Sequence, residues 1–401
     1  MFKITYDEVL VSYYEARKHK RFTESQEVFE LDLFRNLYEL WEELKNGDYT
    51  ISSSKCFMVT RPKLREVFAA DFRDRIVHHV LINHLMSHFQ ELFIENSFSC
   101  MPCRGTLYGV RKLKEAMDRH PNGYVFKFDL KGFFMSIDKK LLCKKLLKYI
   151  DQVIGVVDKD KAEFLKYITR IIVLHCPEKN CNIKGNKILW KNLPAHKSLF
   201  TVKSGLGLAI GNLTSQLFAG FYLDCFDKFM YSVFGDDYGR YVDDFYIVSE
   251  TKEKALHLIP KMEKFLKNHL KLTLHKDKRY IQPVRHGCKF IGSIVKEGRI
   301  YVGNGTVSNM ENTGRRIEKY LNPNEIENIA YVHKCLNSYL GFLSYCNAFD
   351  IALKMIKKIS NSWLQYFDVE ELEVTKEEKR NGKCNKIALR FKDKYKIMNK
   401  L

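Results

Sequence analysis

The sequence is poor in the residues that mark fibrous, disordered or secreted proteins. It has only 8 prolines and 21 glycines in 401 residues, which excludes a collagen-like or linker-like polymer. Its cysteines number 11, an odd set, and residues 1–20 carry Asp7, Glu8 and Glu15 where a signal peptide would have an apolar core. We therefore expect reduced thiols and a cytoplasmic location, and no secreted disulfide scaffold.

Acidic residues are also scarce relative to basic ones. The chain has 67 Lys and Arg against 48 Asp and Glu, a net charge of +19. This excess predicts a polyanionic partner, either nucleic acid or an anionic membrane surface. The most apolar stretch, residues 205–226, carries polar side chains from Asn212 to Asp224, which favours a buried helix over a membrane span. We therefore expect no integral membrane protein.

Helical and extended patterns alternate irregularly along the chain. Hydrophobic residues are 45% of the total, so we expect a folded protein with a large core. Apolar spacing predicts helices over 25–48, 71–94, 107–118, 139–149, 252–270 and 308–365, and strands over 55–68, 124–130, 272–302 and around 243–244. Because helices and strands do not alternate regularly, the pattern predicts an α+β architecture and not a doubly wound parallel sheet.

Three aspartates lie where strands are predicted to end. Side chains alternate along a strand, so Val125, Lys127 and Asp129 share one face of the segment that Asp129 ends. Asp243 and Asp244 stand between two β-rich arms. Each motif alone is also typical of an ordinary turn or strand end. Neighbouring carboxylates repel one another unless cations neutralise them, and three at neighbouring strand ends suit a two-metal site. In a basic chain this combination indicates nucleotidyl transfer.

The ordered motifs resemble those of reverse transcriptases. Tyr241-Val-Asp-Asp244 resembles their catalytic box, and Phe-Lys-Phe-Asp129 resembles their first aspartate motif. Further similar segments are RPKLR at 61–65, FRDRIVHH at 72–79, GLGLAIGNLTSQ at 205–216, LTLHKDK at 272–278 and FIG at 290–292. The resemblance covers roughly residues 55–345. It implies a right-hand polymerase with fingers, a palm built on an antiparallel sheet, and a helical thumb.

The same resemblance implies a division of the chain. The expected parts are an N-terminal helical segment at 1–50, fingers at 51–122 and 139–204, palm at 123–138 and 205–284, thumb at 285–365, and a basic C-terminal extension at 366–401. After the thumb, too little sequence remains in this chain for a further nuclease or integrase domain. The basic runs could follow a phosphate backbone, or they could be solvated helix faces.

The resemblance also assigns roles at the acidic cluster. Asp129, Asp243 and Asp244 would be catalytic and would bind two Mg²⁺ ions, with Mn²⁺ as an alternative, and the backbone carbonyl of Leu130 would add a ligand. Lys278 would assist the departure of pyrophosphate. Lys276 lies two residues away and is the alternative for that role.

Nucleotide and primer contacts follow from the remaining motifs. The residues implied to bind the deoxynucleotide are Lys63, Arg65, Arg75, Leu130, Phe134, Ile210 and Gly211, and the implied primer grip contains Phe290 and Gly292. Arg73 and Arg104 are further phosphate candidates, although about half of such a set is usually surface charge or structural ion pairs. Phe134 would be a steric gate against ribonucleotides, and its alternative is a core side chain.

Several segments are similar to reverse transcriptases of diversity-generating retroelements. They are KSLF at 197–200, IGNLTSQ at 210–216, LNSYLGF at 336–342 and YCN at 345–347. This similarity implies a bacterial or phage origin, a structured noncoding RNA template, a cDNA primer strand and a small basic oligomeric accessory protein. Ile210 stands where many reverse transcriptases have Gln, so a polar check on base pairing is lost and we expect lowered fidelity. The resemblance narrows this expectation to misincorporation opposite template adenine. The alternative is that Ile210 only packs under the following helix.

Three other functions stay open from the sequence. A defence-associated bacterial reverse transcriptase shares several of these motifs and would make a different cDNA. An RNA-dependent RNA polymerase shares the fold, although Phe134 argues against it because a phenyl ring cannot accept a ribose hydroxyl. A non-catalytic RNA-binding protein would also explain the positive charge, and it predicts that the aspartates can be replaced without effect.

Overall fold

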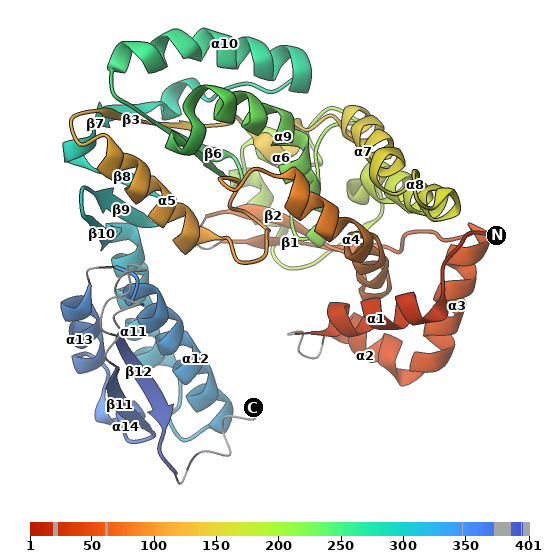
Figure 1. The fold of residues 1–401 in the computed structure, drawn as a ribbon. Helices are drawn as coiled ribbons and strands as arrows, with labels where there is room; N and C mark the ends of the chain where they lie inside the picture. The colour runs from red at the N-terminus through yellow and green to blue at the C-terminus, as the bar shows by residue number, and fades with distance from the viewer. Residues whose placement is uncertain (19–22, 61–62, 347, 373–385, 394, 396–401) are drawn as a thin grey trace.

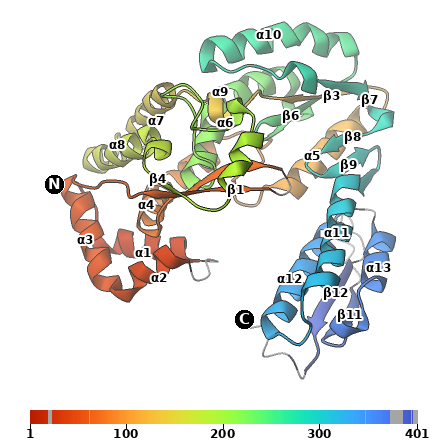
Figure 2. The ribbon, with the colours of Figure 1, turned by 180° about the vertical axis from the view of Figure 1, so that it is seen from behind.

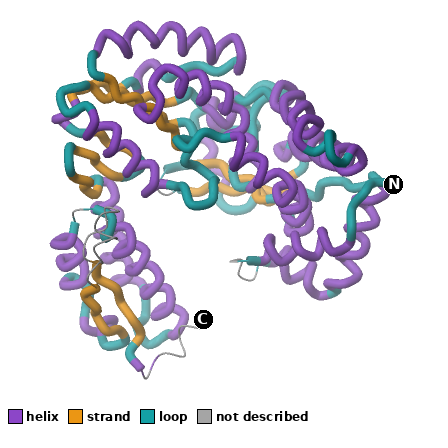
Figure 3. Tube along the Cα trace, in the orientation of Figure 1, coloured by secondary structure: helices purple, strands orange, loops and turns teal. Residues whose placement is uncertain are grey.

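The computed structural model describes residues 1–18, 23–60, 63–346, 348–372, 386–393 and 395. Of the motifs above, Arg61, Pro62 and Asn347 lie outside the described residues, as does most of the Lys-rich stretch at 376–400. Helices and small sheets are mixed throughout, which confirms the predicted α+β class (Figure 3). The N-terminal helices and the C-terminal part of the chain lie at opposite ends of a central body (Figures 1 and 2).

The central sheet has the strand order β5-β6-β3-β7, and all its neighbours are antiparallel. Its strands are β3 (Tyr124–Asp129), β5 (Tyr238–Tyr241), β6 (Asp244–Ser249) and β7 (Tyr280–Pro283). On one face of this palm sheet Phe126, Phe128 and Phe245 are buried in a hydrophobic core shared with the helices α9 (Leu213–Phe234) and α10 (Lys252–Leu270). These helices cover that face in Figure 1.

The opposite face of the palm sheet belongs to a second core. Val125, Tyr246 and Val248 are buried there with residues of α5 (Thr106–Arg119) and of a small hairpin sheet. The hairpin sheet contains β8 (Cys288–Phe290), β9 (Ser293–Lys296) and β10 (Arg299–Val302). The alternation predicted for residues 124–130 is thus confirmed, because odd-numbered residues of β3 face this core and Phe126 and Phe128 face the other.

The second core continues into the C-terminal part of the chain. Its elements are α11 (Asn304–Tyr320), α12 (Ile326–Leu343), α13 (Phe349–Lys357), α14 (Asn361–Leu364), β11 (Phe367–Leu372) and β12 (Lys386–Phe391). The antiparallel pair β11-β12 contacts α12 and α13, and Ile387, Leu389 and Phe391 are buried in this core. The expected boundary at residue 365 therefore falls inside one packed unit.

The fingers region surrounds another sheet. β1 (Ser54–Val59) and β2 (Arg65–Ala69) form an antiparallel pair, and β4 (Cys181–Ile183) joins β1 in parallel. Around them lie α4 (Phe72–Leu92), α7 (Lys139–Val153) and α8 (Lys159–Leu174). Side chains fix where these helices begin, because Asp71, Asp138 and Asp158 accept hydrogen bonds from backbone amides of the first turn. None of the described helices combines the length and the apolar character that crossing a bilayer requires.

The N-terminal helices correct one expectation. The single helix predicted over 25–48 is wrong, because the chain forms α2 (Glu24–Leu31) and α3 (Leu33–Asn46) with a break at Asp32. Asp32 has φ −132° and ψ 60°, which lies outside the helical region. The two helices contact different partners, since α2 lies against α4 and α3 lies against α1 (Tyr6–Arg17). Separate packing of each apolar face explains the break.

The stretch that follows α8, residues 176–204, is anchored by one buried carboxylate. Beyond β4 it contains the short 3₁₀ helices η2 (Lys187–Asn192) and η3 (Ala195–Lys197). Glu66 of β2 accepts hydrogen bonds from Trp190 Nε1 at 2.7 Å, Ser198 Oγ at 2.6 Å and the Leu199 amide at 2.7 Å. We call residues 184–204 the latch loop. These bonds satisfy a carboxylate that is almost fully buried.

Candidate active site

The palm sheet brings two of the three predicted catalytic aspartates together. Asp129 at the end of β3 is the cross-strand partner of Asp244 at the start of β6. Paired residues of an antiparallel ladder point to the same face, so both carboxylates lie on one side of the sheet. Asp243 belongs to the two-residue turn that joins β5 to β6, directly beside Asp244. All three carboxylates therefore occupy one edge of the palm.

Hydrogen bonds from buried residues hold the turn that carries Asp243 in place. Val242 has φ 59°, a left-handed conformation that a β-branched residue adopts at a cost. Its amide donates to Ser99 Oγ at 3.3 Å, and its carbonyl accepts from Arg240 Nη1 at 2.8 Å. Arg240 in turn pairs with Asp227 of α9, and both side chains are only 1% exposed. A buried ion pair thus fixes the backbone of the turn.

The electrostatics of the cluster show an excess of negative charge. Burial, together with the neighbouring carboxylates of Asp129 and Asp244, raises the pKa of Asp243 to about 6. A pKa shift of this sign means that the charged form of Asp243 is disfavoured in the folded chain. A cation placed among these oxygens would relieve that cost.

Two lysines partly neutralise the cluster. Lys278 Nζ lies 2.7 Å from Asp129 Oδ2, and Lys127 Nζ lies 3.0 Å from Asp244 Oδ2. Lys276, the alternative to Lys278, is exposed and forms no ion pair within the described part of the chain. Sequence reasoning missed Lys127, although its place two residues before Asp129 on the same strand face was the available signal.

The acidic cluster is not a closed cage of protein ligands. Among the described residues no three His, Cys, Asp or Glu side chains are arranged as a complete metal-binding group. Mg²⁺ is usually held by one or two carboxylates, with water and substrate phosphates completing its shell. The pKa of Asp243 is raised in part because three carboxylates lie close together, and a bound divalent cation would offset this repulsion. Leu130 is buried and pairs with Leu274, and its role as a carbonyl ligand stays a prediction.

The Ile210-Gly211-Asn212 segment is fastened to the fingers strand β2. The Ile210 carbonyl accepts from the Phe68 amide at 2.9 Å, and Asn212 Oδ1 accepts from the Ala70 amide at 3.2 Å. Gly211 has φ 123°, and a Cβ there would lie 2.8 Å from Val67 Cγ1, so only glycine fits. Asn212 stands at the N-cap position of α9, but its side chain accepts from the residue that follows β2 and makes no capping bond. The segment therefore joins fingers to palm.

The two phenylalanines after Asp129 have different surroundings. Phe133 in the short helix α6 (Phe133–Ser136) is buried, whereas Phe134 is only partly buried. Their rings meet edge to face with centroids 5.5 Å apart, and the Phe134 carbonyl accepts from the Leu208 amide. The side chain of Phe134 is thus accessible for contact, and its role as a gate stays a prediction.

The predicted primer grip lies at the β8-β9 turn. Phe290 is fully buried, and its ring meets that of Tyr246 on the palm sheet edge to face, with centroids 5.3 Å apart. Ile291 and Gly292 form the turn with φ 45° and 83°. Lys127 Nζ lies 5.9 Å from the centre of the Phe290 ring. The hairpin sheet is therefore packed directly beneath the catalytic strands.

The predicted phosphate-binding cations divide into two groups. Lys63 and Arg65 are exposed near the tip of the β1-β2 pair, and Arg75 is half-buried with its Nε bonded to the Ala70 carbonyl at 3.0 Å. Arg73 and Arg104 bond within the protein, which is the structural alternative expected for part of this set. Arg104 donates to the carbonyls of Ile94 and Ser97.

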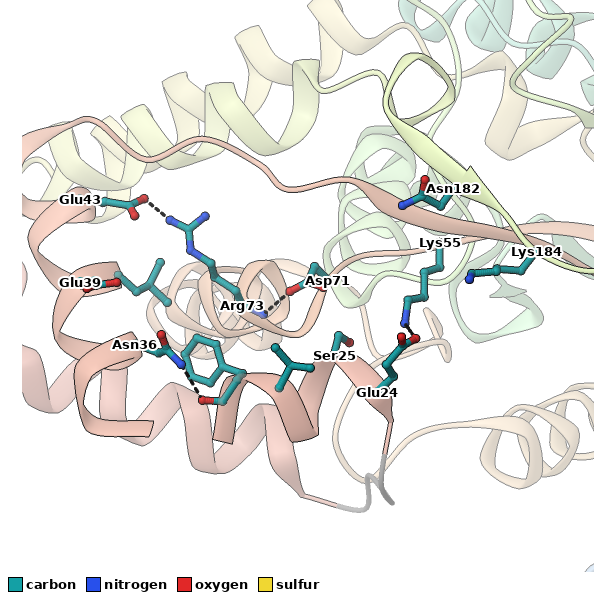
Figure 4. Close-up of a pocket in the computed structure, with 13 residues that line it drawn as sticks. Glu24, Ser25, Asn36, Glu39, Glu43, Lys55, Asp71, Arg73, Asn182 and Lys184 are labelled. Carbon is teal, nitrogen blue, oxygen red and sulfur yellow. Dashed lines mark hydrogen bonds and ion pairs between the residues drawn. The ribbon is translucent and has the colours of Figure 1, made fainter. Parts of the chain in front are cut away.

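Arg73 lines a cavity of about 480 Å³ between α2, α3 and the fingers sheet. There it pairs with Glu43 and donates to the Thr50 carbonyl, while Lys55 pairs with Glu24 across the same cavity. Figure 4 shows these ion pairs linking the N-terminal helices to the fingers. The lining includes none of the three catalytic candidates, so this cavity is separate from the candidate active site.

A family profile described as reverse transcriptase (RNA-dependent DNA polymerase) matches residues 60–295. The chain belongs to the reverse transcriptase family. The matched range covers more than half of the chain and includes β3, the β5-β6 turn, Lys278 and the primer-grip hairpin. The predicted right-hand polymerase class is thereby confirmed.

One solved structure similar to this reverse transcriptase is telomerase from Candida albicans in complex with a fragment of telomeric RNA. The similarity covers 81% of this chain and 59% of that chain, with 12% identity and a TM-score of 0.42. This chain thus spans less than two thirds of the telomerase chain. No curated protein matches its sequence.

Proposed function

We propose that this reverse transcriptase extends a primer with deoxynucleotides on an RNA template. The observation that carries the proposal is the placement of Asp129, Asp243 and Asp244 at one edge of the palm in a member of this family. Two Mg²⁺ ions held there would activate the primer hydroxyl and stabilise the leaving pyrophosphate. Lys278 holds Asp129 and keeps an ammonium group beside the site of that departure.

The residues around the site support selection of deoxynucleotides. The partly buried ring of Phe134 offers no hydrogen-bond acceptor, so a ribose 2′-hydroxyl placed against it would lose a partner. Gly211 allows the backbone of this segment to approach β2 closely. We therefore propose deoxynucleotides as the substrate class, with Lys63, Arg65 and Arg75 as candidate contacts to the triphosphate and template.

The finer proposal is a diversity-generating retroelement enzyme that copies a structured noncoding RNA with errors opposite adenine. Ile210 supports it, because this partly buried side chain beside Phe68 and Ala209 carries no polar group that could check a base pair. A Gln at position 210 would lie partly among apolar neighbours and could still offer its amide to a base pair. Ile210 offers the base pair no polar contact. Bacterial or phage origin, cytoplasmic location and a small basic accessory protein complete this proposal.

Primer extension tests the activity. The full chain should extend oligo(dT) on poly(rA), and a DNA primer on a mixed RNA, in Mg²⁺ or Mn²⁺ with deoxynucleotides. Asp243→Asn with Asp244→Asn should abolish extension while RNA binding is retained, because the substitutions remove charge and keep side-chain volume. Extension by that double variant, or equal use of ribonucleotides by the wild type, would contradict the proposal.

Product sequencing tests the fidelity proposal. Ile210→Gln should lower the error rate opposite template adenine and leave errors opposite other bases unchanged, since a polar contact to the nascent pair is restored. Ile210→Leu is the matched control, because it keeps an aliphatic side chain and should keep the errors. An unchanged spectrum in Ile210→Gln removes the retroelement-type mechanism without affecting the polymerase assignment.

A further inference from the structure

The latch loop reaches the catalytic strand at η3. A Cβ at Gly132 would lie 3.2 Å from the His196 carbonyl oxygen and 3.6 Å from His196 Cδ2, so the imidazole lies against Gly132. Gly132 stands three residues after Asp129, at the turn where the chain leaves β3. Thr201 Oγ1 donates to the Ala195 carbonyl and closes the loop on itself.

The position of η3 is fixed by the fingers. Ser198 and Leu199, the residues that follow η3, are the ones that donate to buried Glu66. Leu199 is buried with Phe68 of β2 in the same small apolar cluster. On the other side, the Gly207 amide donates to the Ile137 carbonyl, so the chain after the loop runs along the segment that follows Gly132. The latch loop is therefore attached to β2 through Glu66, and the chain that follows the loop is attached to the segment after Gly132.

The charges of cationic groups from three chain segments act on His196 in η3. Partial burial lowers the pKa of His196, and the neighbouring charges of Lys197, Lys131, His275 and Lys278 lower it further, in that order. Such a gathering of like charges is unfavourable in the absence of an anion.

Not all of these cations have acidic partners. Lys278 is paired with Asp129, and His275 Nδ1 lies 4.0 Å from Asp277. Lys131 and Lys197 are exposed, and neither ammonium has a carboxylate within 4.0 Å among the residues that the structure describes. Two lysines and an imidazole beside the first catalytic aspartate are therefore available to a ligand of opposite charge.

We propose that Lys131, His196 and Lys197 form a subsite for the polyphosphate group of the incoming nucleotide and of the pyrophosphate that leaves. The inference rests on the proposed polymerase function, because the reacting phosphate must lie at Asp129 and the rest of the triphosphate must extend from there. Ammonium groups make charge-assisted hydrogen bonds to phosphate oxygens, and a neutral imidazole donates one hydrogen bond through its ring N–H. This subsite is distinct from Lys63, Arg65 and Arg75, which come from the β1-β2 pair and α4.

Steady-state kinetics of the full chain test the subsite. Lys131→Ala with Lys197→Ala should raise KM for the deoxynucleotide and the inhibition constant of inorganic pyrophosphate by about tenfold each, since charge-assisted contacts to phosphate are lost. KM for the primer-template should stay unchanged. Lys187→Ala is the matched control, an exposed lysine of the same loop, and should behave as the wild type. Equal constants in the double variant and the control would overturn the inference.

A binding measurement separates this inference from the proposed function. Inorganic tripolyphosphate, titrated calorimetrically into the full chain without nucleotide, should bind the wild type and Lys187→Ala about tenfold more tightly than the double variant. If no template supports synthesis but this difference is found, the polymerase proposal fails and the anion subsite stands. If synthesis is normal and the wild type does not bind tripolyphosphate, or binds it as the double variant does, the subsite alone fails.

Discussion

Two hairpins of this reverse transcriptase use the same strained backbone and stabilise it differently. The β5-β6 turn places Val242 at φ 59°, and the β8-β9 turn places Ile291 at φ 45°. Both are β-branched residues in a left-handed conformation that costs roughly 1–2 kcal/mol. In the first turn the Val242 carbonyl is held by Arg240, which is paired with Asp227. The second turn has no comparable charge behind it among the described residues.

The second turn relies on glycine and on backbone contacts. Gly292 follows Ile291 with φ 83°, and its carbonyl accepts from the Gly303 amide at 2.9 Å. A Cβ at Gly303 would lie 2.5 Å from that carbonyl, so two glycines let the strands approach. The comparison shows that strain beside the catalytic carboxylates is fixed by a buried ion pair, whereas strain at the primer grip is fixed by close backbone packing. The first arrangement sets the position of Asp243.

The largest expected effect is at the buried ion pair. Asp227→Ala should lower the free energy of unfolding by about 3–5 kcal/mol, because it leaves the Arg240 guanidinium buried without a partner. Urea titration measures the change. Glu39→Ala is the control, since Glu39 pairs with Arg35 at an exposed site and should cost under about 1 kcal/mol. Similar losses in both variants would mean that the first turn is not held by charge.

The next effect concerns the charge on the first turn itself. Burial raises the pKa of Asp243 to about 6, above its usual 3.8, so stability is full below about pH 4 and falls as the pH rises through 6. In EDTA at pH 7.5, Asp243→Asn should therefore raise the free energy of unfolding by about 3 kcal/mol, with almost no difference at pH 3.5. Adding Mg²⁺ should stabilise the wild type more than the variant, and chemical denaturation at the two pH values measures both effects.

A third variant tests the side chain that touches both hairpins. Lys127 Nζ pairs with Asp244 and lies over the Phe290 ring. Lys127→Met keeps the length of the side chain and removes its charge, so kcat should fall about tenfold, or about 1.4 kcal/mol, while RNA affinity is unchanged. Lys127→Arg should recover part of the rate. If Lys127→Met kept the full kcat, the two hairpins would act independently.

The smallest effect is expected at the second turn. Ile291→Asn should raise the free energy of unfolding by up to about 1 kcal/mol, because Asn tolerates positive φ and Asn-Gly suits a two-residue hairpin. Thermal unfolding measures it. Ile291→Val keeps the β-branched side chain and should change little. A lower melting temperature in Ile291→Asn would show that the packing of Ile291 outweighs the strain of its backbone.

Local features could be predicted well from the sequence, whereas contacts between residues far apart in the chain could be predicted only through the family resemblance. Alternation placed Lys127 and Asp129 on one face of β3, which the structure confirms. It could not show that Asp244 lies opposite Asp129, because strand register across 115 positions leaves no local pattern. The interruption of the helix at Asp32 was missed for a similar reason, because it follows from the packing of α2 and α3 against different helices.

Long-range anchoring was equally invisible from the sequence. Glu66 bonds to Trp190 across 124 positions, and Asn212 bonds to Ala70 across 142. Neither pair belongs to a periodic pattern, and each polar side chain has an ordinary local alternative as a surface residue or helix cap. The motif order indicated the catalytic aspartates, whereas the side chains that hold them in place required coordinates.

The strand order of the palm has a consequence for how the protein acquires its activity. β3 is flanked by β6 and β7, which are made more than a hundred residues after it. Such non-local pairing is slow to form, because long loops must close before any contact compensates for their entropy. During synthesis Asp129 therefore has no cross-strand partner until Asp244 has been made 115 residues later, so the catalytic edge cannot assemble while the first half of the chain is being synthesised.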